Sequence, residues 1–167
     1  MKIIQPFQGM ITMIDDFIID ETGKNIGCYK IVSVEDNQGN IVNFVVSPNT
    51  YFVDHVMMEI GNIVTGFYDA TAPVPMIFPP QFRALVMTIN SPYQNVEVDY
   101  FNSHLVNSDN TLKLNLSPAT QLVLENGQDF THVPTNINLI VIYGATTRSI
   151  PAQTTPYRII VMCPHTN

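Results

Sequence analysis

The sequence carries little charge, and very little of that charge is positive. Charged residues are 13% of the 167 residues, about half of the usual share. The basic residues are scattered and no two are adjacent in the sequence: Lys2, Lys24, Lys30, Arg83, Lys113, Arg148 and Arg158. Nucleic acids and anionic membranes bind clustered positive charge, so neither is a favoured partner of this acidic chain, whose net charge is −7.

Cysteine and long apolar runs are also scarce. Two cysteines, Cys28 and Cys163, are too few for a disulfide framework or a cysteine-based metal site. We expect free thiols in the core, with Cys163 as the alternative candidate for a thiol that links subunits. No apolar run reaches the roughly 18 residues of a membrane span, and residues 1–8 lack the apolar segment of a signal peptide. Cytoplasmic synthesis is the expectation, and the final compartment stays open.

Motifs for catalysis or metal binding are missing from the sequence. There is no Gly-x-Ser-x-Gly elbow and no glycine-rich phosphate loop. The histidines, which lack metal-ligand spacing, are His55, His104, His132 and His165. The densest acidic cluster, Asp15, Asp16, Asp20 and Glu21, reads as a solvated turn, with calcium as the lesser alternative. The sequence predicts no enzyme, no cofactor and no metal.

Amphipathic helices are nearly absent, and short β-rich runs alternate with turn residues. A kink at residues 47–50 and a connector at 54–59 follow the third predicted strand. The proline-rich segment 72–80 cannot join a central strand because proline lacks the N–H group. The strands predicted for the first half are 9–19, 27–34, 41–46, 63–68 and 82–89. Five strands with a break after the third are typical of an OB barrel.

Several landmarks of the first half recur in the second. Ser47-Pro48-Asn49-Thr50 returns as Ser117-Pro118-Ala119-Thr120, and an aromatic-Arg start heads the runs 82–87 and 157–162. Ordered recurrence of this kind indicates an internal duplication. The strands predicted for the second copy are 96–101, 105–106, 111–116 with 121–124, 139–143 and 157–162. The sequence therefore predicts an all-β chain of two tandem OB-like five-stranded barrels or sandwiches, residues 1–90 and 91–167.

Conspicuous motifs in the chain resemble those of a known group of proteins. They are Gly-x-x-Val-x-Gly-Phe-Tyr-Asp from Gly61, Pro-x-x-x-Pro-Pro-Gln-Phe-x-Ala from Pro75, and Ser149-Ile150-Pro151-Ala152-Gln153-Thr154. With these motifs the chain resembles uncharacterised OB-like proteins of spore-forming Gram-positive, clostridial-type bacteria. The resemblance implies the fold and the kind of source. It implies no catalytic residues.

The proline-rich loops are the best candidates for a contact surface, because rigid loops lose little entropy on binding. We predict a non-enzymatic structural or interaction protein that assembles with copies of itself as a surface or spore-associated filament or layer. Residues 1–8 are a candidate strand donor to a neighbour. The alternative is an OB-type binding module for oligosaccharide or peptide. The candidate contact residues are Phe78, Pro79, Pro80, Phe82, Tyr93, Ile150 and Pro151.

Overall fold

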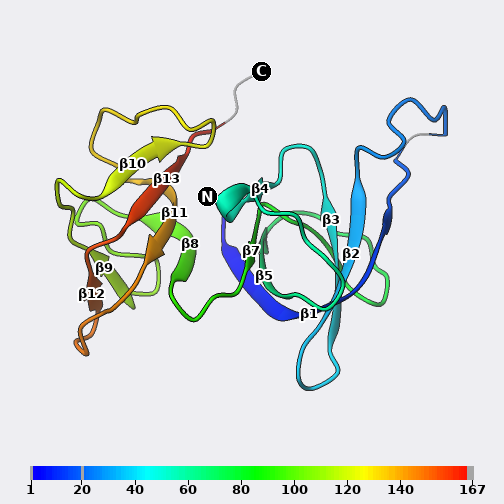
Figure 1. Ribbon diagram of the computed structural model, residues 1–167, viewed down its shortest axis with the longest axis horizontal. Coiled ribbons are helices and arrows are strands. Elements are labelled where there is room, and N and C mark those ends of the chain that lie inside the picture. Colours follow the sequence, from blue (N-terminus) through cyan, green and yellow to red (C-terminus); the bar gives the residue numbers. More distant parts are fainter. Residues whose placement is uncertain (1, 20, 165–167) are drawn as a thin grey trace. The chain divides into compact units, whose positions relative to one another are not determined.

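The computed structural model describes residues 2–19 and 21–164, which are mostly strands and connecting loops (Figure 1). The all-β prediction is confirmed. The chain forms two compact units, residues 1–90 and 91–167. The elements of the first unit are β1 (Ile4–Asp16), β2 (Lys30–Glu35), β3 (Ile41–Val46), β4 (Tyr51–Phe52), the 3₁₀ turn η1 (Val53–His55), β5 (Ile63–Asp69), β6 (Gln81–Arg83) and β7 (Val86–Ile89).

The first unit is organised around β1, a long strand that changes partner along its length. Its first part pairs with β5 and its second part pairs with β2, both antiparallel. β2 then pairs with β3, while β3 and β4 run parallel to β6 and β7. Because β7 also pairs with β5, the pairing runs from β5 through β1, β2 and β3 to the β6–β7 segment and returns to β5.

Alternating side chains build the core of this unit. In β3, every second residue is buried, and the residues between are half-buried. This alternation is the period-2 pattern of a strand with one face toward a core. The buried residues of the core are Ile11, Val32, Val34, Val42, Phe44, Val46, Val64, Ala84 and Met87.

The second unit repeats these pairings with fewer residues. Its strands are β8 (Asn95–Phe101), β9 (Leu112–Leu114), β10 (Gln121–Leu124), β11 (Ile137–Tyr143), β12 (Ala152–Thr154) and β13 (Arg158–Met162). β11 pairs antiparallel with β8 and β13, as β5 pairs with β1 and β7. β9 and β10 run parallel to β12 and β13, as β3 and β4 run parallel to β6 and β7. The core residues are Phe101, Leu112, Leu114, Leu139, Val141, Ile159 and Val161.

One strand of the first unit has no full counterpart in the second. Residues 105–106, predicted as a strand, lie where a counterpart of β2 belongs, between β8 and β9. The structure has only two isolated bridges there, Phe101 with Asn107 and Val106 with Lys113. A turn-rich segment between β8 and β9 therefore takes the place of a full strand.

The two Ser-Pro-x-Thr segments make the same hydrogen bonds. The backbone N–H of Ser47 donates to the Thr50 hydroxyl, which donates to the Ala84 carbonyl oxygen at 2.8 Å. In the second unit Ser117 donates to Thr120 in the same way, and that hydroxyl donates to the Pro156 carbonyl oxygen at 2.8 Å. Thr50 thus joins the kink after β3 to the residues before β7. Thr120 joins the kink after β9 to the residues before β13.

The structure corrects the predicted alignment of the last strands. The Leu85 N–H donates to Phe67 and its carbonyl oxygen accepts from Tyr51, and Tyr157 makes the equivalent bonds with Ile142 and Gln121. Leu85, not Phe82, is therefore the counterpart of Tyr157. The prediction that residues 82–87 align with residues 157–162 from their aromatic-Arg starts was therefore wrong. Phe82 belongs to β6, a separate short strand.

Several strand boundaries also differ from the predictions. β1 begins at Ile4, and its residues 4–10 pair with β5 in the same unit, so these residues are not a free strand donor for a neighbour. The predicted strand 82–89 is broken at Ala84 and Leu85 into β6 and β7. β12 lies outside every strand predicted from the sequence. Such short parallel strands have no hydrophobic run of their own, which is why the sequence pattern missed them.

Candidate functional site

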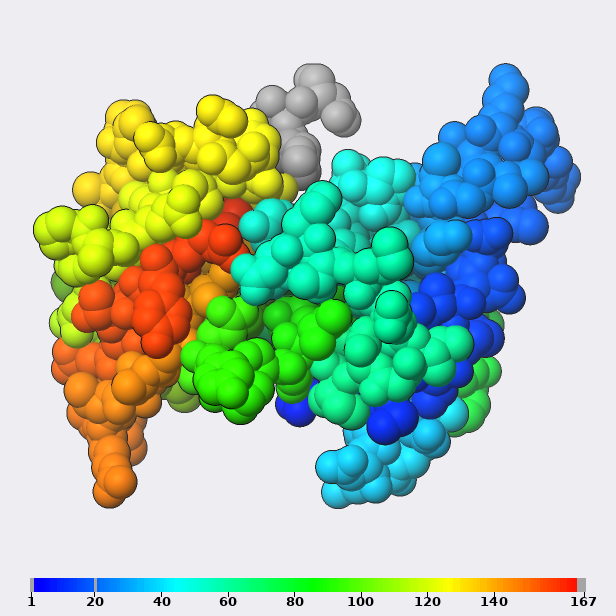
Figure 2. All heavy atoms as spheres, viewed as in Figure 1, coloured from blue at the N-terminus to red at the C-terminus, as the bar shows by residue number. Residues whose placement is uncertain are grey.

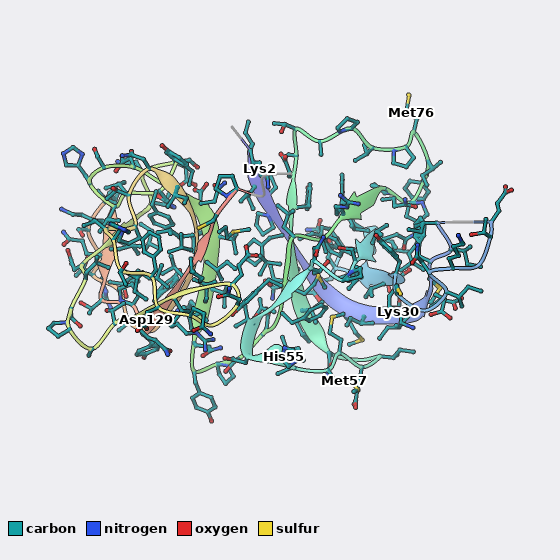
Figure 3. The ribbon with its side chains drawn as sticks, turned by 90° about the horizontal axis from the view of Figure 1, so that it is seen from above. Lys2, Lys30, His55, Met57, Met76 and Asp129 are labelled. Atoms are coloured by element: carbon teal, nitrogen blue, oxygen red, sulfur yellow. The ribbon has the colours of Figure 1, made fainter. Side chains whose placement is uncertain are left out.

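In each unit, some of the most exposed apolar side chains lie at the tip of the proline-rich loop. In the first unit the loop between β5 and β6 carries Met76 and Phe78, and Phe78 is 87% exposed. In the second unit the loop between β11 and β12 carries Ile150, which is 90% exposed. Figure 3 shows Met76 pointing away from its unit at the outer end of the loop.

The two loops match in backbone geometry as well as in exposure. Phe78–Pro79 and Ile150–Pro151 are both cis peptide bonds. Each bond immediately precedes a short strand, β6 or β12, that runs parallel to β3 or β9. Each loop therefore presents one large apolar residue just before its cis-proline, at the same place in the unit. We call Phe78 and Ile150 the paired tips.

Each loop is tied back to its own unit. The Pro80 carbonyl oxygen accepts from the Asn43 N–H at 2.9 Å. In the second unit the Ser149 hydroxyl donates to the Pro151 carbonyl oxygen at 2.8 Å, and the Thr147 hydroxyl accepts from the Gln153 N–H at 2.9 Å. The second loop projects as a narrow orange tip in Figure 2. These bonds fix the bases of the loops and leave the tips in solvent.

The other predicted contact residues differ in exposure. Tyr93 is 86% exposed in the turn at residues 91–94, where its N–H donates to the Ser91 hydroxyl. Phe82 is half-buried against the core and stacks on Tyr68 with ring centroids 4.0 Å apart. Pro79, Pro80 and Pro151 are half-buried. The structure therefore exposes Phe78, Tyr93 and Ile150 and assigns Phe82 a packing role.

A chain of four rings runs through the first unit. Phe7 contacts Phe44, Phe44 contacts Tyr68, and Tyr68 stacks on Phe82. Burial raises the pKa of the Tyr68 hydroxyl. By pairing register the four counterparts in the second unit are Glu97, Leu114, Tyr143 and Thr154. Of these four positions in the second unit, only that of Tyr143 is aromatic.

Glu97 is the titratable residue that sequence reasoning missed. It pairs with the core residue Val141, so its side chain shares the inner face of the sheet. Burial, and then the charges of Asp99 and Asp109, raise the pKa of its carboxyl from 4.5 to about 7, against a lowering hydrogen bond from the Val98 N–H. Burial and the Glu97 charge raise the pKa of Tyr143. The one signal in the sequence that could have identified Glu97 as inward-facing is Phe7, which occupies the equivalent position of the first unit.

Two other carboxylates, those of Asp99 and Asp36, accept hydrogen bonds from nearby loop residues. Asp99 accepts from the N–H and the hydroxyl of Ser108. Asp36 accepts hydrogen bonds from the Asn40 side chain and from the backbone of Asn40 and Gln38, and these bonds lower its pKa. The Asp36 carboxylate thus closes the hairpin between β2 and β3. In the cluster considered for calcium, Asp16 pairs with Lys30, and Asp20 lies outside the described residues.

The cysteines are exposed free thiols, so the prediction of core thiols was wrong for both. Cys28 follows a turn before β2. Cys163 follows β13 and lines a shallow cavity of about 270 Å³ with Leu124, Glu125, Asn126, Val161 and Pro164. Both thiols lie outside the strands, Cys28 before β2 and Cys163 after β13. Cys163 remains a candidate for linking subunits.

Within residues 2–19 and 21–164, no three His, Cys, Asp or Glu side chains are grouped as a metal site. His165 lies outside the described residues. In the same part of the chain, no helix has the length and apolar character needed to cross a membrane. No known family model, curated protein or solved structure matches this chain.

Proposed function

We propose that this chain is a non-enzymatic structural or interaction protein whose copies associate through the paired tips. The observation that carries the proposal is the recurrence of one exposed apolar residue at the same place in the loop before β6 and before β12. Contiguous exposed apolar residues mark contact surfaces, and Met76, Ile77 and Phe78 are consecutive and exposed in the first loop. A chain with two such tips has two points of attachment.

Each unit is proposed to be an OB-type barrel, and the pair to descend from an internal duplication. The support is the ring of pairings around β1 in the first unit, with β3 parallel to β6. The matching pairings of the second unit and the shared threonine hydrogen bonds add to it. An OB barrel has five strands in Greek-key order, with loops at its ends that make contacts.

Low charge favours contact between copies of the chain. Charged residues are 13% of the sequence, so little ion desolvation opposes the approach of two surfaces. If a tip on one unit seats on a surface elsewhere on a neighbour, the contact is head-to-tail and generates a filament unless it closes into a ring. A filament or layer on a spore or cell surface is a setting that would suit the sequence resemblance.

Light scattering over a range of protein concentrations tests this proposal. The parent chain should exceed its monomer mass of 18.7 kDa, and negative-stain electron microscopy should show ordered polymers. The double variant Phe78→Ser, Ile150→Ser should scatter as a monomer, while either single variant should give short oligomers. Each change removes an apolar contact worth about 1.5–3 kcal/mol if fully buried at the interface.

A matched control changes two other exposed isoleucines. Ile18 and Ile26 are 67% and 66% exposed in the connection between β1 and β2. The double variant Ile18→Ser, Ile26→Ser should assemble like the parent. A monomeric parent, or a tip variant as large as the parent, would overturn the proposal.

A further inference from the structure

A small cavity opens in the first unit beside its proline-rich loop. It has a volume of about 200 Å³. It lies where the start of β1, the end of β5 and the beginning of β6 meet the loop. The residues that line it are Lys2, Asp69, Ala72, Pro73, Val74, Phe82, Arg83 and Leu85.

The charge of this cavity is opposite to that of the chain. Lys2 and Arg83 are two of only seven basic residues, and both line the cavity. The single acidic group, Asp69, already accepts hydrogen bonds from Thr71 and Ile3. Burial raises the pKa of Asp69, but the bonds from Thr71 and Ile3 and the Lys2 charge together lower it, so it stays ionised. Lys2 and Arg83 together carry two positive charges and Asp69 carries one negative charge. The cavity therefore has a net positive charge that can attract an anionic ligand.

Arg83 is available to bind an anion. In the part of the chain that the structure describes, no carboxylate pairs with its exposed guanidinium. A guanidinium binds a carboxylate through two parallel hydrogen bonds, and this geometry discriminates more sharply than an ammonium charge. The apolar wall is supplied by Phe82, which is held in place by stacking on Tyr68, with Val74 and Leu85.

The equivalent place in the second unit is occupied by a side chain of the unit itself. The counterparts of Leu85 and Asp69 are Tyr157 and Gly144, by the pairing of β13 with β11. The Tyr157 hydroxyl end lies so close to Gly144 that a Cβ there would collide with it. The second unit therefore covers this place with its own phenol ring. In the first unit Leu85 is shorter, Asp69 carries a Cβ, and the place is open.

We propose that this cavity binds an aromatic carboxylate, a single ring placed against Phe82, Val74 and Leu85 with its carboxylate on Arg83 and Lys2. The volume suits one ring and is too small for a drug-sized ligand. Two sources share this chemistry: a C-terminal aromatic residue of a peptide and a free arylalkanoate. The site does not depend on self-association through the paired tips.

Nuclear magnetic resonance titration of the full chain tests the site. The probes are 3-phenylpropionate, the peptide Gly-Gly-Gly-Phe and the same peptide with a C-terminal amide. Both carboxylates should shift the amide signals of residues 69–74 and 82–85 saturably. The amide-capped peptide should bind at least about tenfold more weakly because the charge-assisted bonds are lost. A peptide that binds tighter than 3-phenylpropionate identifies a chain terminus as the source, and the reverse order identifies a free acid.

Three variants separate the charge from the cavity. Arg83→Gln should raise the Kd at least about fivefold, since a charge-assisted hydrogen bond is lost. Ala72→Trp, at an exposed loop position, should fill the cavity and abolish binding. Arg148→Gln, an exposed arginine in the other unit, should leave the Kd unchanged. The proposal is overturned if no signal saturates at millimolar probe, if the amide-capped peptide binds equally well, or if Arg83→Gln matches Arg148→Gln.

Discussion

At the scale of single residues, the two units differ most at the position of Phe7 and Glu97. Phe7 packs on Phe44 in the first core, whereas Glu97 places a carboxyl on the inner face of the second. A buried carboxylate loses hydration, and Asp99 and Asp109 add repulsion. The structure reduces this cost by raising the pKa, so that the neutral acid is populated near neutral pH.

Glu97 should make the protein less stable as pH rises. Its folded-state pKa of about 7 lies above the value of 4.5 expected for the unfolded chain. The folded state therefore binds the proton more tightly, and the stability present below pH 4.5 is lost as pH rises through 7. Glu97→Gln should remove this dependence and stabilise the protein at pH 8 by at most about 3 kcal/mol.

Urea unfolding at pH 5, 6, 7 and 8 measures this effect. The difference in unfolding free energy between Glu97→Gln and the parent should grow with pH. Glu21→Gln, at an exposed turn glutamate, is the control and should track the parent. A constant difference across the four pH values would contradict the assignment of the raised pKa to Glu97.

At the scale of elements, the missing counterpart of β2 explains how β8 has room for Asp99 where β1 has Gly9. In the first unit β2 lies against β1, and a Cβ at Gly9 would collide with the backbone of Glu35 and Asp36. The counterpart of Gly9 by register is Asp99, through their partners Val64 and Leu139. A full strand does not lie against β8, so Asp99 has room and its carboxylate binds Ser108 in the connecting segment.

Gly9→Ala should therefore be strongly destabilising. The obstacle is main chain, which cannot turn aside as a side-chain end can, so we expect the loss to reach or exceed the upper end of about 1–3 kcal/mol. Urea unfolding followed by circular dichroism measures it. Gln8→Ala, at the exposed neighbouring position, should cost less than about 1 kcal/mol. Equal stability of the two variants would show that β1 and β2 can separate without loss.

At the scale of the whole molecule, the net charge of −7 affects the proposed association between copies of the chain. Copies repel each other at long range, while the paired tips offer apolar contact at short range. Self-association should therefore increase with salt. This is opposite to the behaviour of an interface held by ion pairs, and it follows from screening of the shared negative charge.

Light scattering at two ionic strengths checks this expectation. Raising salt from about 0.01 M to about 0.1 M shortens the Debye length from about 30 Å to about 10 Å. The mean mass of the parent should rise several-fold, and the Phe78→Ser, Ile150→Ser variant should stay monomeric at both. A mean mass that falls with salt would assign the contact to ion pairs instead of apolar tips.

Features that depend on local pattern could be predicted from the residues alone. Alternating residues in β3 specify a strand, proline excludes residues 72–80 from a central strand, and the repeated Ser-Pro-x-Thr identified two matching kinks. The same local rules predicted that Phe78 and Ile150 would be available for contact. Both residues are exposed in loops that lie outside the strand pairings.

Only the tertiary structure decided the features that join distant segments. The counterpart of Tyr157 is Leu85 because of hydrogen bonds across neighbouring strands, although Phe82 matches it better in residue type. The inward position of Glu97 follows from its pairing with Val141, and Lys2 meets Arg83 only where β1 and β6 approach one loop. Pairing between strands far apart in sequence depends on contacts across the whole unit, which no local pattern records.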